Sequence, residues 1–299
     1  MVSDLNIPTH QLPRPISWLN TLLILSDSQA ASTSSKVTSL KSVKNPHLVI
    51  NFLKQTGFDN TQMKKLVSRA PKLLIRDVSN TLKPKLRCLM DLGLSVSDLV
   101  NVIAKDPHII GRGLATRLRP TIDFLMTTLV SDENVVKALK RFPWLLSFGA
   151  LGIMETNLLL LRNYGVPDVR IKKLLLRNPT YFAQKPEWIK GLLHRVENDF
   201  QVPRDSPSFL YGFQALSWQK KSTLDRKFGI FKSFGWSDDD ILHMFRKLPY
   251  CVGLSEVRIQ EKLNFFMKEL GFESAYLVSH PAILSYSLDK RGWYLGCKS

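Results

Sequence analysis

Apolar residues recur along this chain at spacings of three and four, which is the pattern of one buried helix face. In the clearest copies they stand eight, five and four positions before a proline, as Met63, Leu66 and Val67 do before Pro71. Proline lacks an N–H and its ring clashes with the preceding turn, so we expect a helix to end at each one. The apolar pair after each proline is expected to enter the core. The marking prolines are Pro71, Pro107, Pro143, Pro179, Pro249 and Pro281.

A second marker precedes the proline by fourteen residues and is a glycine in four copies. These glycines are Gly57, Gly93, Gly165 and Gly235. Leu129 and Gln201 take this place in two other copies, and Gly271 lies ten residues before Pro281. Glycine tolerates the left-handed conformation that closes a helix, so the marker predicts a turn between two helices. Candidate N-caps for the second helix are Asn60, Ser95, Ser131, Asp168 and Ser237.

Each copy is therefore predicted to form helix, turn, helix, proline break and short apolar turn. The first four prolines stand 36 residues apart, and this period is typical of stacked helical repeats. One such unit cannot bury its apolar face alone, so we predict an all-α solenoid of about seven repeats that forms a curved superhelix over residues 36–291. The fifth copy is distorted, because Ala215 replaces its proline and Pro203 and Pro207 interrupt its second helix.

The segments outside the array have a different composition. Residues 1–35 carry one arginine and two aspartates, so we interpret them as an incomplete transit peptide or a disordered tail. Residues 292–299 do not continue the repeat and are interpreted as a divergent tail. No apolar stretch of the sequence approaches the roughly 20 residues that cross a bilayer. Three scattered cysteines fit a reducing compartment, and Cys88 and Cys251, but not Cys297, fall in apolar stripes.

The charge of the chain is strongly basic and unevenly distributed. The formal net charge is +17. Residues 36–199 hold 27 basic and 13 acidic residues, whereas residues 200–299 hold 14 and 10. An extended basic surface in the first repeats would attract a polyanion such as nucleic acid. The alternative is that this charge serves solubility alone.

The clearest periodic polar signal lies two residues before each proline. Five copies carry a basic residue there, and Ser279 is the exception: Arg69, Lys105, Arg141, Arg177 and Lys247. We call these five residues the basic ladder, and we expect them to contact phosphates along one edge. The alternative is structural, because cations in the last turn of a helix offset its dipole. Further candidates for nucleic-acid binding are Arg76, Arg112, Arg119, Lys137 and Lys173.

The sequence contains only weak signals for catalysis or base stacking. The six histidines show no metal-ligand spacing, and the sequence contains no phosphate-binding glycine loop, so we expect neither an enzyme nor a metal or cofactor. Residues 238–240 are all Asp and are interpreted as the acidic first turn of a helix. Aromatic residues near the breaks could stack on bases, but most are expected to fill the core. They are Trp144, Tyr181, Phe182 and Tyr250.

The repeats resemble those of the mitochondrial transcription termination factor (mTERF) family, in its plant branch. The resemblance rests on the basic-x-Pro-x-Leu-Leu signature and on GWSDDDIL at residues 235–242 with FRKLPYC at 245–251. The segments at residues 136–141 and 285–291 are also similar, and the resemblance covers roughly residues 36–291. It implies a helical repeat that holds nucleic acid against a basic surface in an organelle.

The resemblance further implies a role in transcription termination, initiation or transcript processing. We expect a monomer that binds double-stranded DNA, with no membrane partner, in the mitochondrion. RNA binding, a chloroplast location and a protein-binding scaffold remain the alternatives, and a hydrolase or transferase is a more distant one.

Overall fold

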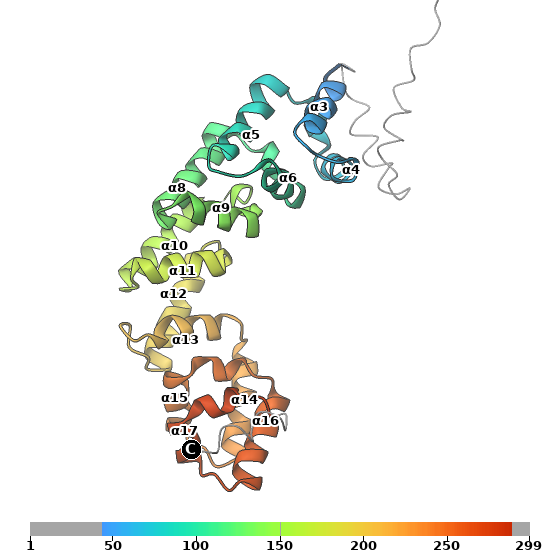
Figure 1. Ribbon diagram of the computed structural model, residues 1–299. Helices are drawn as coiled ribbons and strands as arrows, with labels where there is room; N and C mark the ends of the chain where they lie inside the picture. Colours follow the sequence, from blue (N-terminus) through green and yellow to red (C-terminus); the bar gives the residue numbers. More distant parts are fainter. Residues whose placement is uncertain (1–43, 150, 289–299) are drawn as a thin grey trace, which may run out of the picture. The chain divides into compact units, whose positions relative to one another are not determined.

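The computed structural model describes residues 44–149 and 151–288, and every regular element in those ranges is helical (Figure 1). The all-α repeat fold predicted from the proline spacing is therefore confirmed. The predicted leader at residues 1–35, the tail at residues 292–299 and Cys297 lie outside the described residues. Within the described ranges, no helix is long and apolar enough to cross a membrane.

The first four repeats each consist of two helices and a short turn. The first contains α3 (Lys44–Gln55), α4 (Asn60–Arg69) and η1 (Pro71–Ile75). The second contains η2 (Val78–Leu82), α5 (Lys83–Met90), α6 (Val96–Lys105) and α7 (His108–Gly111). The third contains η3 (Leu114–Leu118), α8 (Arg119–Leu129), α9 (Asp132–Arg141) and η4 (Pro143–Leu146). The fourth contains α10 (Leu151–Asn163), α11 (Asp168–Arg177) and η5 (Pro179–Tyr181).

The last three repeats keep this order, although the fifth lacks the final turn. The fifth contains α12 (Pro186–His194), η6 (Arg195–Asp199) and α13 (Ser208–Ser217). The sixth contains α14 (Lys221–Ser233), α15 (Asp238–Lys247) and η7 (Pro249–Gly253). The seventh contains α16 (Glu256–Leu263), η8 (Asn264–Glu269), α17 (Ser274–Ser279) and η9 (Pro281–Ser285). Ala215 lies inside α13, so that helix continues where the others meet a proline.

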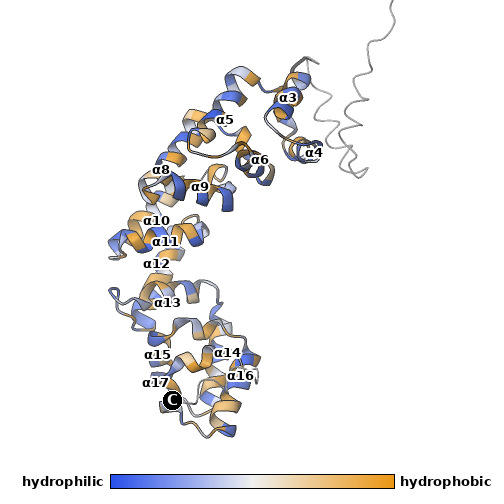
Figure 2. Cartoon of the chain, viewed as in Figure 1, coloured by the Kyte–Doolittle hydropathy of each residue, from blue (hydrophilic) through white to orange (hydrophobic). Residues whose placement is uncertain are grey.

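The chain forms two compact units. The N-terminal unit extends to Gly152 and includes Lys172–Pro179, and the C-terminal unit contains Ile153–Ile171 and the rest from Thr180. In the N-terminal unit α6 packs against α4 and α9, and in the C-terminal unit α15 packs against α13 and α17. Stacking of second helices from successive repeats therefore buries their apolar faces, as the repeat pattern predicts. Figure 2 shows hydrophobic and hydrophilic residues alternating along these helices.

The proline breaks have the geometry that the sequence predicts. Helices α4, α6, α9, α11 and α15 all end two residues before the proline. The apolar pair that follows is buried at Leu73 and Leu74, and the same holds in the next three repeats and the sixth. In the seventh, Leu284 is buried and Ile283 is half-buried. Each break thus inserts two side chains into the core between successive repeats.

The turns between paired helices keep a left-handed residue even where glycine is missing. The glycines at the marker position have positive φ, for example 99° at Gly57. In the third repeat Val130 adopts φ 65°, one residue after the predicted position, and Gln201 adopts φ 52° in the fifth. The repeat geometry therefore holds these two residues in a left-handed backbone conformation that is normally unfavourable for residues other than glycine.

The predicted N-caps are mostly confirmed. The hydroxyls of Ser95, Ser131 and Ser237 each accept a hydrogen bond from the backbone N–H three residues later. In the first repeat the cap is Asp59 instead of Asn60, because the Asp59 carboxylate accepts the N–H of Gln62. Asp168 is the first residue of α11. The triple aspartate opens α15 as predicted, and Asp240 completes a capping box with Ser237.

Buried polar side chains tie the first helix of several repeats to the turn after the proline. The ammonium groups of Lys85 and Lys227 donate to the carbonyls of Ile110 and Val252, each at 2.7 Å. Lys262 bonds in the same way to the Tyr286 carbonyl. Asn157 occupies the equivalent place in the fourth repeat and donates to the Phe182 carbonyl at 2.9 Å. Burial lowers the pKa of all three lysines below the usual value.

Candidate nucleic-acid interface

Every residue of the basic ladder is the last residue of its helix and is exposed. The lysines and arginines of the ladder nevertheless have different surroundings. The Lys105 ammonium donates to the Lys140 carbonyl at 3.1 Å, and the Lys247 ammonium donates to the Ser279 carbonyl at 3.2 Å. Both acceptors lie at the end of the second helix of the next repeat. The two lysines therefore link successive repeats through hydrogen bonds. This is a structural role, which was the alternative to phosphate contact for the ladder.

The three arginines of the ladder retain their polar donors. Within the described residues, Arg69 and Arg177 make no side-chain hydrogen bond or ion pair that would engage the guanidinium. The Arg141 guanidinium lies 5.1 Å from the centre of the Phe142 ring, a contact that leaves its N–H groups available. An arginine with open donors can bind phosphate in a bidentate manner. The ladder thus divides into lysines with one N–H donor engaged by the next repeat and arginines with open guanidinium donors.

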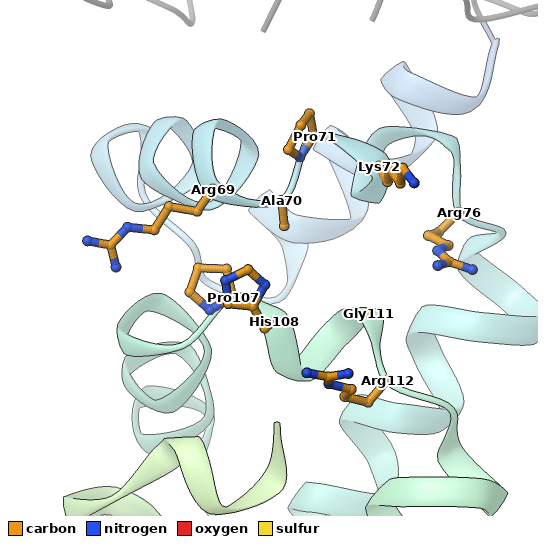
Figure 3. A pocket seen from close by; sticks show the side chains of 9 residues that line it. All are labelled: Arg69, Ala70, Pro71, Lys72, Arg76, Pro107, His108, Gly111 and Arg112. Carbon is orange, nitrogen blue, oxygen red and sulfur yellow. The ribbon is translucent and has the colours of Figure 1, made fainter. Parts of the chain in front are cut away.

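A half-open basic pocket lies between the proline turns of the first and second repeats (Figure 3). Its volume is about 700 Å³. Figure 3 shows Arg69 on one side of the pocket and Arg76 and Arg112 on the other. We call it the basic pocket, and its lining residues are Arg69, Ala70, Pro71, Lys72, Arg76, Pro107, His108, Gly111 and Arg112.

The backbone geometry of the repeat brings these side chains together. Arg69 ends α4, Lys72 lies in η1, and Arg76 follows that turn. His108 begins α7 and Arg112 follows it, at the same positions of the second repeat that Lys72 and Arg76 occupy in the first. Successive turns stack, so residues 36 apart in sequence line one space. Sequence analysis selected Arg69, Arg76 and Arg112, and the structure places Lys72 and His108 beside them in the lining.

The basic pocket has four cationic side chains and no acidic side chain in its lining. Arg69, Lys72, Arg76 and Arg112 are all exposed. The charge of Arg76 also acts on Lys85 behind the turn, where it adds to burial in lowering the pKa of that ammonium. Like charges that line one pocket without an acidic residue favour the binding of an anion with several charges. Phosphate groups of a nucleic-acid backbone match this arrangement.

The two units differ in charge and in how that charge is neutralised. Among described residues, the N-terminal unit has 20 basic and 8 acidic residues, a net of +12, and the C-terminal unit has 16 and 14, a net of +2. The ion pair between Lys140 and Asp98, at 2.7 Å, is the one recorded among the described residues of the N-terminal unit. Lys140 lowers the pKa of the Asp98 carboxyl through this hydrogen bond.

The C-terminal unit contains most of the ion pairs. They include a two-pronged pair in which Arg204 donates to both carboxylate oxygens of Glu197, at 2.5 and 2.8 Å. This pairing lowers the pKa of Glu197. Arg226 pairs with Glu256 at 2.9 Å. Five of the six ion pairs found among the described residues thus lie in the C-terminal unit, and the excess of positive charge lies mainly in the N-terminal unit.

The remaining candidates lie outside the basic pocket. Arg119 begins α8, Lys137 lies on α9 and Lys173 lies on α11, and all three are exposed. Of the aromatic residues near the breaks, Tyr181 and Phe182 are buried in the core as expected. Tyr250 is exposed instead. Within the described residues, no group of three or more histidine, cysteine or acidic side chains could hold a metal ion.

The fold and this interface define a class, the basic helical-repeat proteins whose second helices end at a proline turn. The model of the mTERF family matches residues 50–184 and 152–292, which together cover most of the chain. The protein therefore belongs to the mTERF family. A segment of 81 residues is 31% identical to the chloroplastic transcription termination factor MTERF8 of Arabidopsis thaliana. That segment spans 27% of this chain and 16% of the relative.

Proposed function

We propose that this protein binds nucleic acid through phosphate contacts and acts in organelle transcription without catalysing a reaction. The observation that carries the proposal is the basic pocket, whose lining contains four exposed cations and no acidic residue. Membership of the mTERF family supports the same reading. Double-stranded DNA is the partner we expect, because its regularly spaced phosphates match cations that recur with each repeat.

The biological role follows from the relative and is proposed on that basis. The relative is called a chloroplastic transcription termination factor, and the similar segment is a small part of its length. We propose transcription termination or regulation in an organelle. The sequence alone suggested the mitochondrion as the location. The name of this relative supports the chloroplast, which we therefore propose as an equally favoured location. A monomer suffices for this role, because the repeats supply several phosphate contacts in one chain.

The test measures binding to duplex DNA, single-stranded DNA and RNA across a salt series. The double variant Arg76→Ala/Arg112→Ala removes two cations from the basic pocket, and Arg258→Ala removes an exposed cation from the C-terminal unit as the matched control. Each phosphate contact contributes about 0.9 to the slope of log affinity against log salt. We expect the slope to fall by roughly two in the double variant and to stay unchanged in the control.

The same series separates the alternatives. A preference for RNA over duplex DNA would favour transcript processing. The absence of binding to all three nucleic acids at low salt would refute the proposed function and favour a protein-binding scaffold.

A further inference from the structure

Three aromatic side chains form a continuous exposed cluster in the C-terminal unit. Tyr211, Trp218 and Tyr250 are 45%, 59% and 36% exposed. The Tyr250 ring lies between the other two, with its centroid 5.5 Å from that of Tyr211 and 6.3 Å from that of Trp218. Large aromatic residues are normally buried, so three of them in contact at the surface require an explanation. We call these three residues the aromatic cluster.

The fold holds this cluster in place. Tyr211 and Trp218 stand seven residues apart along α13 and its C-cap, which places them on one face two turns apart. Gln214 lies between them and accepts a hydrogen bond from the Tyr250 hydroxyl at 2.5 Å. The planes of Trp218 and Tyr250 are inclined by only 26°. Rings that are fixed in advance lose little conformational freedom when a planar ligand stacks on them.

One member of the cluster, Tyr250, lies at a repeat position that lines the basic pocket in the N-terminal unit. Tyr250 directly follows Pro249, as Lys72 follows Pro71 and His108 follows Pro107. The charges nearby are also suitable for a nucleic acid, because exposed Lys220 and Lys221 follow the cluster in sequence. The position after the proline therefore carries Lys72 and His108 in one unit and an aromatic ring of the cluster in the other.

We propose that the aromatic cluster binds unpaired bases of single-stranded nucleic acid by stacking. Every base has a flat π-face, so aromatic rings bind single strands with little dependence on sequence. Lysines at the margin would contact the adjoining phosphates. An aliphatic protein partner is favoured less, since the exposed surface here consists of rings with polar groups and positive charge. The inference rests on the proposed nucleic-acid binding and adds a second site with a different ligand chemistry.

The experiment uses the full chain and labelled oligo(dT) and oligo(U), with a duplex of the same length, in fluorescence anisotropy titrations. Trp218→Ala and Tyr250→Ala should each weaken single-strand binding by about 5- to 150-fold, since stacking on one ring has this range of effect. Duplex binding should change less than twofold. Trp218→Phe and Tyr250→Phe keep a ring, so they should retain most of the affinity. Thermal melts of each variant show whether folding is intact.

An abasic oligonucleotide separates base stacking from phosphate contact. Removing the bases should weaken binding by the wild-type protein to the level of Trp218→Ala, and should weaken the variant no further. Unchanged single-strand affinity in Trp218→Ala, or an equal loss for duplex and single strand, would overturn the inference. Loss of self-association in Trp218→Ala with unchanged single-strand affinity would assign the cluster to a second copy of the chain and overturn it also.

The basic-pocket variant tests the proposed function separately from the stacking inference. If Arg76→Ala/Arg112→Ala weakens binding while Trp218→Ala does not, the stacking inference fails and the proposed function stands. If the wild-type protein binds no nucleic acid, the proposed function fails as well.

Discussion

The position that follows the proline differs in chemistry between the first two repeats and the sixth. The first two repeats present Lys72 and His108 there, the third has the half-buried Trp144, and the sixth presents the exposed Tyr250. The N-terminal unit has four exposed cations around the basic pocket, whereas the C-terminal unit contains five of the six ion pairs found among the described residues and exposes rings. The repeat backbone places side chains at equivalent positions, and we infer that the residue types at those positions determine the ligand.

The comparison also separates cations that build the fold from cations that are available to a ligand. Lys85 and Lys227 belong to different units, yet both are buried and bonded to a turn carbonyl. Lys105 and Lys247 likewise bond to the next repeat in each unit. These contacts are common to both units and belong to the repeat. What distinguishes the units is the set of exposed arginines and lysines beyond them.

The largest effect is expected from reversing charge in the basic pocket. Arg76→Glu/Arg112→Glu replaces two proposed phosphate contacts with two repulsive charges, and each such contact would account for about 0.9 log units of affinity at 0.1 M salt. Duplex affinity should therefore fall by about 100-fold or more. The matched change Arg258→Glu in the C-terminal unit should have an effect several times smaller. Affinity is measured by anisotropy at one salt concentration. Equal losses of duplex affinity in the two variants would show that the two units do not differ in phosphate binding.

The next effect concerns stability in both units. Lys85→Ala and Lys227→Ala each leave a buried carbonyl without its donor, which costs about 1–3 kcal/mol. We expect a lower free energy of unfolding in chemical denaturation, with the salt slope of binding unchanged. Lys64→Ala, at a half-buried helix position without such a bond, is the control. If Lys85→Ala reduced the salt slope without destabilising the fold, Lys85 would be a phosphate contact.

A smaller effect is expected within the basic ladder. Arg141→Ala should weaken binding to all sequences by a similar factor and reduce the salt slope by roughly one, since phosphate contacts carry no base information. Its effect on stability should stay near the 0.3–1 kcal/mol of a cation in a last helical turn. Lys105→Ala should show the reverse, because its ammonium bonds to the next repeat. A thermal melt beside each salt titration distinguishes the two. A marked drop in melting temperature for Arg141→Ala with unchanged affinity would make it a structural cap.

The smallest effect depends on pH. Burial raises the pKa of the Cys251 thiol to about 12. The thiol of the unfolded chain has an ordinary pKa near 9.0, so above pH 9 the unfolded state releases a proton that the folded state retains. The stability that Cys251 contributes is complete below pH 9 and is lost as the pH rises toward 12. Between pH 9 and 10, wild type should lose about 1 kcal/mol relative to Cys251→Ala in denaturant titrations. A constant difference between the two proteins would show that the thiol is accessible to water.

Much of the fold follows from the sequence because apolar spacing and proline both act locally. The spacing of Met63, Leu66 and Val67 before Pro71 defines a helix face and its end without reference to the rest of the chain. The left-handed turns at Val130 and Gln201 were not predictable from residue type, because tertiary packing overrides the local preference. The cap at Asp59 instead of Asn60 is a one-residue shift of the kind that only geometry decides.

The interface was less predictable, because its chemistry depends on which turns stack. Arg76 and Arg112 were found by following the breaks, but their meeting with Lys72 and His108 depends on contact between successive repeats. Lys85 and Lys227 resemble surface residues in sequence, although their equal distance before the proline was a signal that could have identified them. Most of the aromatic residues near the breaks were expected in the core, and Tyr250 is an exception because its exposure depends on which elements pack over its turn.

Lysine acetylation with mass spectrometry tests the central claim most directly, because it reports which unit a bound duplex covers. Lys72 lines the basic pocket, and Lys190 is an exposed lysine of the C-terminal unit. Adding saturating duplex DNA should slow acetylation of Lys72 severalfold and leave that of Lys190 nearly unchanged. Equal acetylation of Lys72 with and without duplex, while anisotropy confirms that the complex has formed, would contradict the claim that the basic pocket holds the nucleic acid.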